Sequence, residues 1–349
     1  MQSENRMPTA VLICDDSNLA RKQLAKILPQ EWQENLYFAG HGAEALAVLS
    51  QHAIDWLFLD LNMPVMDGYQ VLAELKKSNS KTKVVIVSGD IQPEAYERAK
   101  ALGAIDFIKK PAETAKIQQL LQRFGASPSL NSATDIATDK TAKILQAEAI
   151  ELSCDMRDVL QELTNIAMGQ AGDLLARLLN VFVKLPIPNV NLIEVSELHM
   201  ALASVEREAS TAAVCQGFIG GGVSGEALLI LSESSYKDIA RLMNYHGSLS
   251  AQIELELLMD ISNILIGAVL KGLSEQLDIS FSQGHPVVLG QRETVSELIK
   301  SNARRWRKTL AIELTYGIEN YNISCDLLLL FTEDSLKTLN YKVAYLLEG

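Results

Sequence analysis

Residues 57–68 read LFLDLNMPVMDG, in which an apolar run ends at Asp60 and a turn rich in small and polar residues follows. This run, 55–59 (DWLFL), is one of four apolar runs of about one strand length that polar side chains follow. The others are 10–14 (AVLIC), 83–87 (KVVIV) and 104–108 (AIDFI). Amphipathic segments such as 17–28 and 66–77 separate the runs. Strands that alternate with helices predict an α/β domain with a doubly wound parallel sheet.

Polar residues follow the ends of these predicted strands. They are Asp15, Asp16, Asp60, Ser88 and Lys110. In a doubly wound sheet the carboxyl ends of the strands form the binding site, so we expect these side chains to converge. Clustered carboxylates repel each other unless a cation joins them, and oxygen ligands suit Mg²⁺. A lysine and a hydroxyl nearby would hold the oxygens of a phosphoryl group on Asp60.

Length and composition narrow the class of protein. The 349 residues suggest two or three domains, each able to bury a core. The net charge of −12 argues against a nucleic-acid partner, which needs a basic face. The polar start and the lack of an apolar run of roughly 20 residues argue against a signal peptide and a membrane span. Four scattered cysteines fit a cytoplasmic protein with buried thiols and no zinc site.

A polar connector rich in Ser, Ala, Thr and Asp occupies 126–142 and separates a first domain (1–125) from a second (143–349). Within the second domain a residue pattern recurs after 98 positions. The matching pairs are Asp158/Glu256, Glu162/Asp260, Asn165/Asn263, Gly169/Gly267 and Pro188/Pro286. Two repeats, about 150–245 and 250–349, predict a pseudo-symmetric α+β domain. Its strands, such as 211–218 with 226–232, are expected to be antiparallel.

The repeat continues outside the helices. VSEL occurs at 195–198 and 295–298, and ALLILSESSYKDI (227–239) aligns with LLLLFTEDSLKTL (327–339). The glycine run 220–225 leads into a strand and lacks a Gly-Lys-Ser/Thr ending, so it predicts a hairpin turn rather than a phosphate loop.

On a helix, Asp158, Glu162, Asn165 and Gly169 fall within one stripe. The opposite, inward face is predicted to hold apolar residues: Leu160, Leu163, Ala167, Ala171, Leu174 and Leu178. Gly169 weakens the helix by roughly 1 kcal/mol relative to alanine, which close approach of another surface would explain. A solvated helix face with a packing glycine is the plain alternative. An acid and an amide three residues apart could instead hold a water against a phosphoryl group.

The first domain resembles the CheY-like response-regulator receiver family over about residues 8–125. The matching stretches are ICDDSNLARKQL, LFLDLNMPVMDG, VIVSGD and GAIDFIKKP. The resemblance implies that Asp60 is the phosphoacceptor and that a sensor histidine kinase is its phosphodonor. It implies Mg²⁺ ligands at Asp15, Asp16, Asp60 and the backbone carbonyl of Asn62. It also implies a switch pair, Ser88 and Phe107, and a phosphate-contacting Lys110 before a cis-proline.

The second domain resembles the CheC/CheX/FliY class of chemotaxis phosphatases, in which a helix docks on a phosphorylated receiver. The first motif, Asp158, Glu162, Asn165 and Pro188, matches that family fully. The second motif, Glu256, Asp260, Asn263 and Pro286, has Glu and Asp where the family usually has Asp/Ser and Glu. The resemblance implies that Asn165 and Asn263 position water and that Glu162 and Asp260 contact the receiver lysine. The substrate would be a CheY-like regulator or the chain's own receiver, in cis or across a homodimer.

The sequence therefore predicts a chemotaxis or two-component signalling protein with aspartyl-phosphate phosphatase activity. A non-catalytic module, whose grip on a partner changes when Asp60 is phosphorylated, is the alternative.

Overall fold

The computed structural model describes residues 9–124, 153–194, 211–289 and 308–348. We call residues 9–124 the first domain and residues 153–348 the second domain. The predicted connector at 126–142, the helix expected from residue 144 and the paired VSEL segments lie outside the described residues.

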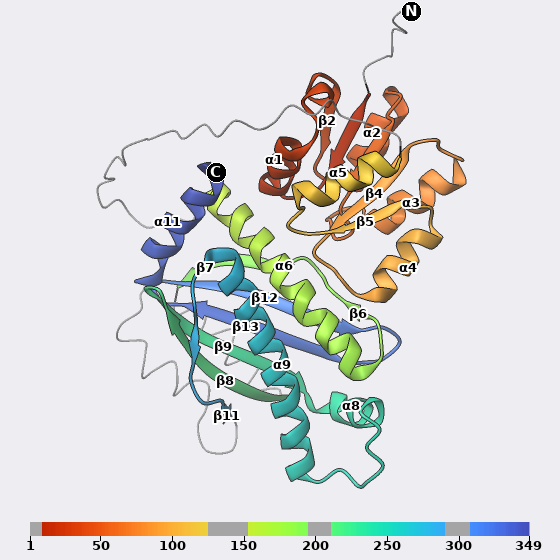
Figure 1. Cartoon of the computed structure of the whole chain (residues 1–349). Coiled ribbons are helices and arrows are strands. Elements are labelled where there is room, and N and C mark those ends of the chain that lie inside the picture. The colour runs from red at the N-terminus through yellow and green to blue at the C-terminus, as the bar shows by residue number, and fades with distance from the viewer. Residues whose placement is uncertain (1–8, 125–152, 195–210, 290–307, 349) are drawn as a thin grey trace, which may run out of the picture.

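The first domain has a parallel sheet with the strand order β2-β1-β3-β4-β5 and helices on both faces (Figure 1). Its strands are β1 (Val11–Cys14), β2 (Leu36–Ala39), β3 (Trp56–Leu59), β4 (Lys83–Ser88) and β5 (Asp106–Lys109). Its helices are α1 (Asn18–Ile27), η1 (Gln30–Asn35, 3-10), α2 (Gly42–Gln51), α3 (Gly68–Lys77), α4 (Pro93–Ala101) and α5 (Thr114–Arg123). The α/β prediction is confirmed.

Strand β2 is the element that the sequence prediction missed. It lies at the edge of the sheet and pairs only with β1 among the described strands. Leu36 and Tyr37 are only partly buried, Phe38 is exposed, and Ala39 alone in this strand is buried. An edge strand of four residues carries too weak an apolar run to be distinguished from the loop that surrounds it.

The second domain contains an eight-stranded sheet in which every described pairing is antiparallel. The order is β10-β8-β9-β13-β12-β6, with β11 beside β8 and β7 beside β12. The strands are β6 (Val183–Lys184), β7 (Asn189–Glu194), β8 (Thr211–Gly220), β9 (Val223–Ser232), β10 (Ser282–Gln283), β11 (Val287–Leu289), β12 (Lys308–Ile318) and β13 (Ser324–Phe331). The predicted hairpin is confirmed, and Gly221 and Gly222 form its turn with positive φ.

Two long helices, α6 (Cys154–Leu179) and α9 (Ala251–Leu277), pack side by side against one face of this sheet (Figure 1). Shorter helices complete the domain: η2 (Glu233–Ser235, 3-10), α8 (Tyr236–Leu242) and α11 (Ser335–Glu348). Both long helices end at a left-handed cap residue, Asn180 after α6 and Asp278 after α9. These caps are 98 positions apart, like the motif residues. The internal duplication itself stays a prediction.

The predicted inward face of α6 is correct through Ala171 and wrong at Leu174 and Leu178. Leu160, Leu163, Ala167 and Ala171 are buried, whereas Leu174 is 49% and Leu178 36% exposed. The cysteine prediction is likewise wrong at Cys154, which is exposed at the first turn of α6, while the other three are buried. Among the described residues no helix is long and apolar enough to cross a membrane.

The two domains exchange core residues across their contact. Leu19 of α1 belongs to the core between α6, α9 and the antiparallel sheet. Phe182, which follows α6, belongs to the core on one face of the parallel sheet. The domains are therefore packed together through buried apolar side chains as well as polar ones.

Candidate functional site

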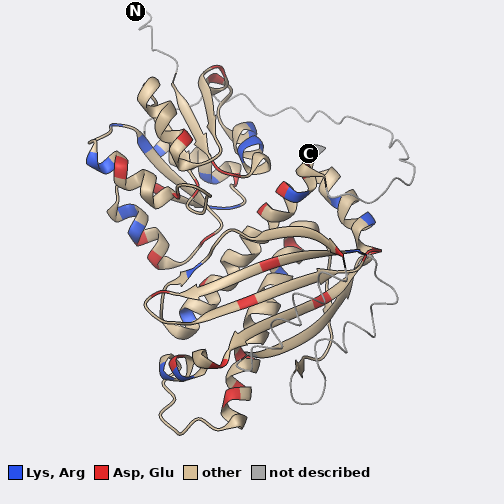
Figure 2. Ribbon diagram, turned by 180° about the vertical axis from the view of Figure 1, so that it is seen from behind, with Lys and Arg blue, Asp and Glu red and all other residues tan. Residues whose placement is uncertain are grey.

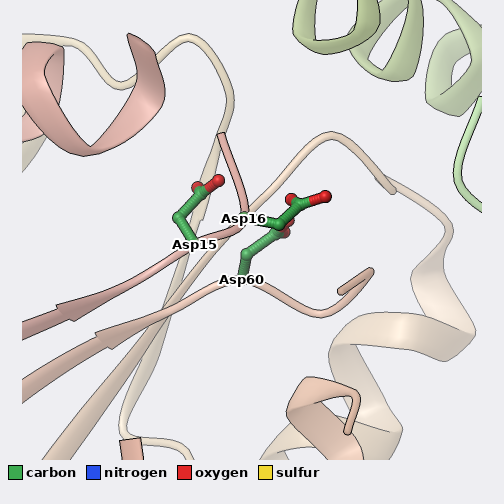
Figure 3. A group of neighbouring side chains, drawn as sticks. All are labelled: Asp15, Asp16 and Asp60. Atoms are coloured by element: carbon green, nitrogen blue, oxygen red, sulfur yellow. The ribbon is translucent and has the colours of Figure 1, made fainter. Parts of the chain in front are cut away.

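Three carboxylates meet at the carboxyl ends of β1 and β3 (Figure 3). Asp15 and Asp16 follow β1, and Asp60 follows β3, because parallel strands end at the same edge of the sheet. One oxygen of each lies within 4.8 Å of the others. Asp15 and Asp60 are buried, and backbone amides fix them: Ser17 N–H donates to Asp15 and Leu61 N–H to Asp60.

Lys110 links this cluster to the second domain. Its Nζ lies 2.8 Å from Asp15 Oδ2 and 3.3 Å from Asp60 Oδ2. The same ammonium lies 3.0 Å from Oε1 of Glu162, which is on α6. The Lys110–Pro111 peptide bond is cis, as expected. One buried ammonium therefore serves three carboxylates from two domains.

Burial and the neighbouring charges raise the pKa values of three acids at this edge. Burial raises the pKa of Asp60 to about 6 and of Asp16 to about 7. Burial also raises the pKa of Glu162 to about 8, since Lys110 is shared with Asp15 and Asp60. Lys110 itself stays charged, because the surrounding carboxylates outweigh its desolvation and raise its pKa. The cluster has more negative charge than Lys110 can neutralise, which favours a further cation.

The residues present fit a magnesium ion. The carboxylates of Asp15, Asp16 and Asp60 supply hard oxygen donors at the required proximity, and Asp16 is only partly buried. Asn62, expected to offer its backbone carbonyl, lies two residues after Asp60 and is half-buried.

The remaining predicted residues of the first domain surround the same edge. Ser88 ends β4, is fully buried and accepts a hydrogen bond from the Asp90 N–H through its hydroxyl. Phe107 lies on β5, and its ring centroid is 5.9 Å from that of Tyr96 on α4. The structure thus brings Ser88 to the same carboxyl edge as Asp60, while Phe107 faces α4.

Helix α6 lies against this edge through its motif face. Both carboxylate oxygens of Asp158 accept hydrogen bonds from the first turn of α1, at 3.1 Å from Asn18 N and 3.0 Å from Leu19 N. A carboxylate at a helix N-terminus satisfies free amides and the helix dipole. Gln161 Nε2 lies 3.4 Å from Asp16 Oδ2. Asp158 is therefore a docking residue for α1.

Two glycines allow the helix to approach this closely. A Cβ on Gly169 would lie 2.0 Å from the carbonyl oxygen of Gly89, in the loop after β4. A Cβ on Gly89 would lie 3.3 Å from the backbone oxygen of Asn165. The helix-weakening Gly169 is thus explained by backbone-to-backbone contact with the first domain.

Glu162 and Asn165 face away from their own core, as predicted, yet both are 5% exposed because the first domain covers them. The side-chain oxygen of Asn165 is buried and accepts no hydrogen bond from the described residues. Buried polar atoms nearly always have a partner, so this oxygen is suited to accept a hydrogen bond from a small molecule such as water.

The second motif has a different environment. Glu256, Asp260 and Asn263 on α9 are all exposed. No atom of the described residues outside the helix itself lies within 4 Å of a Cβ built on Gly267. The structure therefore does not bring the second motif to the carboxylate cluster. The first domain covers the motif on α6, whereas the motif on α9 is exposed.

A further contact was not predicted from the sequence. Gln92 and Arg98 of the first domain touch Phe182, Val183 and Glu319 of the second. Neither side of this contact belongs to a repeated or spaced motif, so the sequence held no signal for it.

Comparison with known proteins agrees with the geometry of the first domain. Residues 11–122 match the response regulator receiver domain family. The chemotaxis protein CheY of Treponema pallidum is 32% identical over 118 residues, which cover 33% of this chain and 82% of that protein. A protein-glutamate methylesterase/protein-glutamine glutaminase of Rhodospirillum rubrum is 40% identical over 110 residues; the match spans 31% of this chain and 30% of that protein.

Among solved structures, FliY of Thermotoga maritima covers 56% of this chain and 99% of its own, with 19% identity and a TM-score of 0.43. The CheX-CheY-BeF3-Mg+2 complex of Borrelia burgdorferi contains a chain that is 31% identical, covers 36% of this chain and 95% of its own, and has a TM-score of 0.33. The family match, the identity to CheY and the carboxylate–lysine edge of a parallel sheet agree. Through residues 11–122, the chain belongs to the response regulator receiver family of two-component and chemotaxis signalling.

Proposed function

We propose that this chain is a phosphorylatable receiver joined to an aspartyl-phosphate phosphatase whose α6 site acts on the chain's own Asp60. The α6 site comprises Asp158, Glu162 and Asn165. The observation that carries the proposal is the contact between Glu162 and Lys110, which in turn touches Asp60. An acid and an amide from α6 thereby lie against the phosphoacceptor edge.

Hydrolysis of an aspartyl phosphate needs an in-line water and neutralised charge more than a covalent contribution from the protein. Lys110 would bind the phosphoryl oxygens, and Glu162 would hold that lysine in place. The free oxygen of Asn165 would accept a hydrogen bond from the attacking water. The water's oxygen would bond to phosphorus as the bond to Asp60 breaks, giving inorganic phosphate and the Asp60 carboxylate. Magnesium held by Asp15, Asp16, Asp60 and the Asn62 carbonyl would offset charge on the phosphoryl group.

The α9 site, comprising Glu256, Asp260 and Asn263, is proposed to serve a separate CheY-like regulator. Its exposure and the open space at Gly267 support this assignment. Asp260 is one methylene shorter than the glutamate of the α6 site, so its reach to a lysine is shorter by about 1 Å, and we expect slower turnover by up to about 100-fold. A sensor histidine kinase is the proposed phosphodonor for Asp60.

The second candidate is the non-catalytic module. It is favoured by one observation: the Lys110 ammonium contacts both Asp60 and Glu162 of α6, so a phosphoryl group on Asp60 would alter a contact that joins the two domains.

The test is the lifetime of the phosphoryl group on Asp60 in the full chain, labelled with a small acyl phosphate. The Asn165→Ala variant should lengthen the lifetime by about 100-fold. Asn263→Ala is the matched control and should leave the lifetime unchanged, because Asn263 is exposed on α9 and has no contact with the receiver edge among the described residues. An Asn165→Ala lifetime equal to that of wild type would reject the phosphatase and favour the gated module.

A further inference from the structure

We propose that a second contact between the domains, separate from the Lys110 contact at Asp60, selects this chain's own receiver for the α6 site. We call it the α4 contact: Gln92 and Arg98 on the receiver side, and Phe182, Val183 and Glu319 on the other. Its role in docking follows from geometry alone. Its role in choosing the substrate rests on the proposed phosphatase function.

The first half of the α4 contact imitates a strand pairing. The Gln92 amide group donates to the Val183 carbonyl at 2.8 Å and accepts from the Val183 N–H at 2.9 Å. Gln92 is 1% exposed, so both hydrogen bonds are shielded from water. Removing one partner of such a pair leaves a buried polar group unsatisfied, which costs more than the hydrogen bond contributes. A receiver with an apolar residue here would leave the Val183 backbone unpaired.

The second half depends on Arg98. Its guanidinium forms a two-pronged ion pair with Glu319, with Nη1 at 3.1 Å from Oε1 and Nη2 on Oε2. It also lies 4.0 Å from the ring centroid of Phe182. Two-pronged pairing with a carboxylate requires the planar guanidinium of arginine, and arginine also stacks on an aromatic ring more often than lysine does. Phe182 in turn inserts into the receiver core.

Arg98 is also held by an acidic residue of its own helix. Glu94 also accepts from Arg98, at 2.7 Å. Figure 2 shows basic and acidic residues mixed along the receiver helices rather than gathered on one face. Recognition at α4 therefore depends on the placement of one arginine rather than on a general attraction between domains.

In the second domain, the positions that correspond to Phe182 and Glu319 in the other repeat lack the matching groups. The residue 98 positions after Phe182 is Ser280, and the residue 100 positions before Glu319 is Ile219. Ser280 lies against Gly220 in the corresponding turn. Neither an aromatic ring nor a carboxylate is available at these two positions for an arginine on α4. The α4 contact is thus specific to the side of the domain that carries α6.

The consequence is a division of partners. The α6 site accepts a receiver that carries glutamine before α4 and arginine in its second turn, as this chain's own receiver does. A receiver without these residues meets unpaired Val183 and Glu319 and is disfavoured at α6.

Docking is measured first, in the full chain, by energy transfer between dyes on Cys154 and on a cysteine introduced by Lys81→Cys. Cys154 is the exposed native thiol, and Lys81 is an exposed receiver residue. Arg98→Glu and Glu319→Arg should each lower the equilibrium ratio of docked to undocked chains by about 10-fold. The double variant should recover most of it, since the guanidinium introduced at position 319 would face both Glu94 and the new carboxylate at position 98. Full docking in both single variants, or no recovery in the double variant, would overturn the proposal.

Selectivity is measured second, with the α9 site removed by Asn263→Ala. The substrate is a labelled receiver-only regulator that lacks arginine at the α4 position. Its turnover should rise by about 10-fold in Arg98→Glu, because the chain's own receiver vacates α6. Turnover that stays unchanged although energy transfer reports undocking would overturn the selecting role. Failure of the phosphatase proposal is seen separately, because Asn165→Ala would then leave all phosphoryl lifetimes unchanged while the docking results stand.

Discussion

Replacing Gly169 with alanine should separate the α6 site from the receiver without harming the helix. The new Cβ would lie 2.0 Å from the Gly89 oxygen and 2.5 Å from its carbonyl carbon, whereas ordinary contact begins at 3.4 Å. Both obstructing atoms are backbone, so no side-chain rotation relieves the overlap. The domains must therefore move apart by on the order of 1 Å, a misplacement that costs about 100-fold in positional catalysis.

The matching glycine on α9, Gly267, provides the control. Gly267 occupies the same place on α9, and within the described part of the chain no neighbouring element lies within 4 Å of its Cβ position. Alanine favours a helix by about 1 kcal/mol over glycine, so both variants should keep or raise the stability of their helix.

The assay follows the phosphoryl lifetime of Asp60 together with urea unfolding. We expect Gly169→Ala to lengthen the lifetime by about 100-fold and Gly267→Ala to leave it unchanged. Equal lifetimes in Gly169→Ala and wild type would refute the close approach as a requirement for hydrolysis.

Three further results are expected. Asp158→Ala should weaken docking by about 10-fold in the energy-transfer assay, because two α1 amides lose their acceptor, whereas Glu256→Ala should have no effect. Docking in metal-free buffer should weaken as pH rises toward 8, by at most about 1.4 kcal/mol per pH unit. The reason is that burial raises the pKa of Glu162 to about 8 in the docked form, so the docked form binds one more proton than the undocked form. Glu162→Gln should remove this pH dependence of docking. A pH dependence that persists in Glu162→Gln would assign it to another group. Chelation of divalent ions should slow hydrolysis, and Asp16→Asn should raise the magnesium concentration needed to restore it, as a direct titration of the rate would reveal.

The receiver edge could be predicted from sequence because parallel strands place their carboxyl ends together. Asp15, Asp60, Ser88 and Lys110 each follow an apolar run, so the order of the runs determines their meeting place. Strand β2 escaped prediction because an edge strand is short and half-exposed. Burial of Cys154 was wrongly expected because a residue type alone does not say on which turn of a helix it lies.

From the residue pattern alone, the docking of the two domains could be predicted only at Gly169; the contact of Glu162 with the receiver lysine followed from the family resemblance, which left open whether the receiver was this chain's own. Gly169 signalled a close approach, since a glycine inside a helix has a cost. The approaching surface was not specified, because Gly89 has no pattern that links it to α6. Leu174 and Leu178 fit the apolar spacing of α6, but at the end of the helix the core receives the adjacent Leu175 and Leu179 instead, a choice between neighbouring positions that periodicity does not make. The Arg98–Glu319 pair joins residues 221 positions apart, and pairings of this kind arise only from the fold.

The most direct test of the account mixes two full-length variants, both carrying Asn263→Ala. One carries a labelled phosphoryl group on Asp60 and the Asn165→Ala change; the other has an intact α6 site and the Asp60→Asn change. Docking within one chain predicts that the label on the first keeps its long lifetime at every concentration of the second. A lifetime that shortens in proportion to the added second variant would contradict the account and show that the α6 site acts between chains.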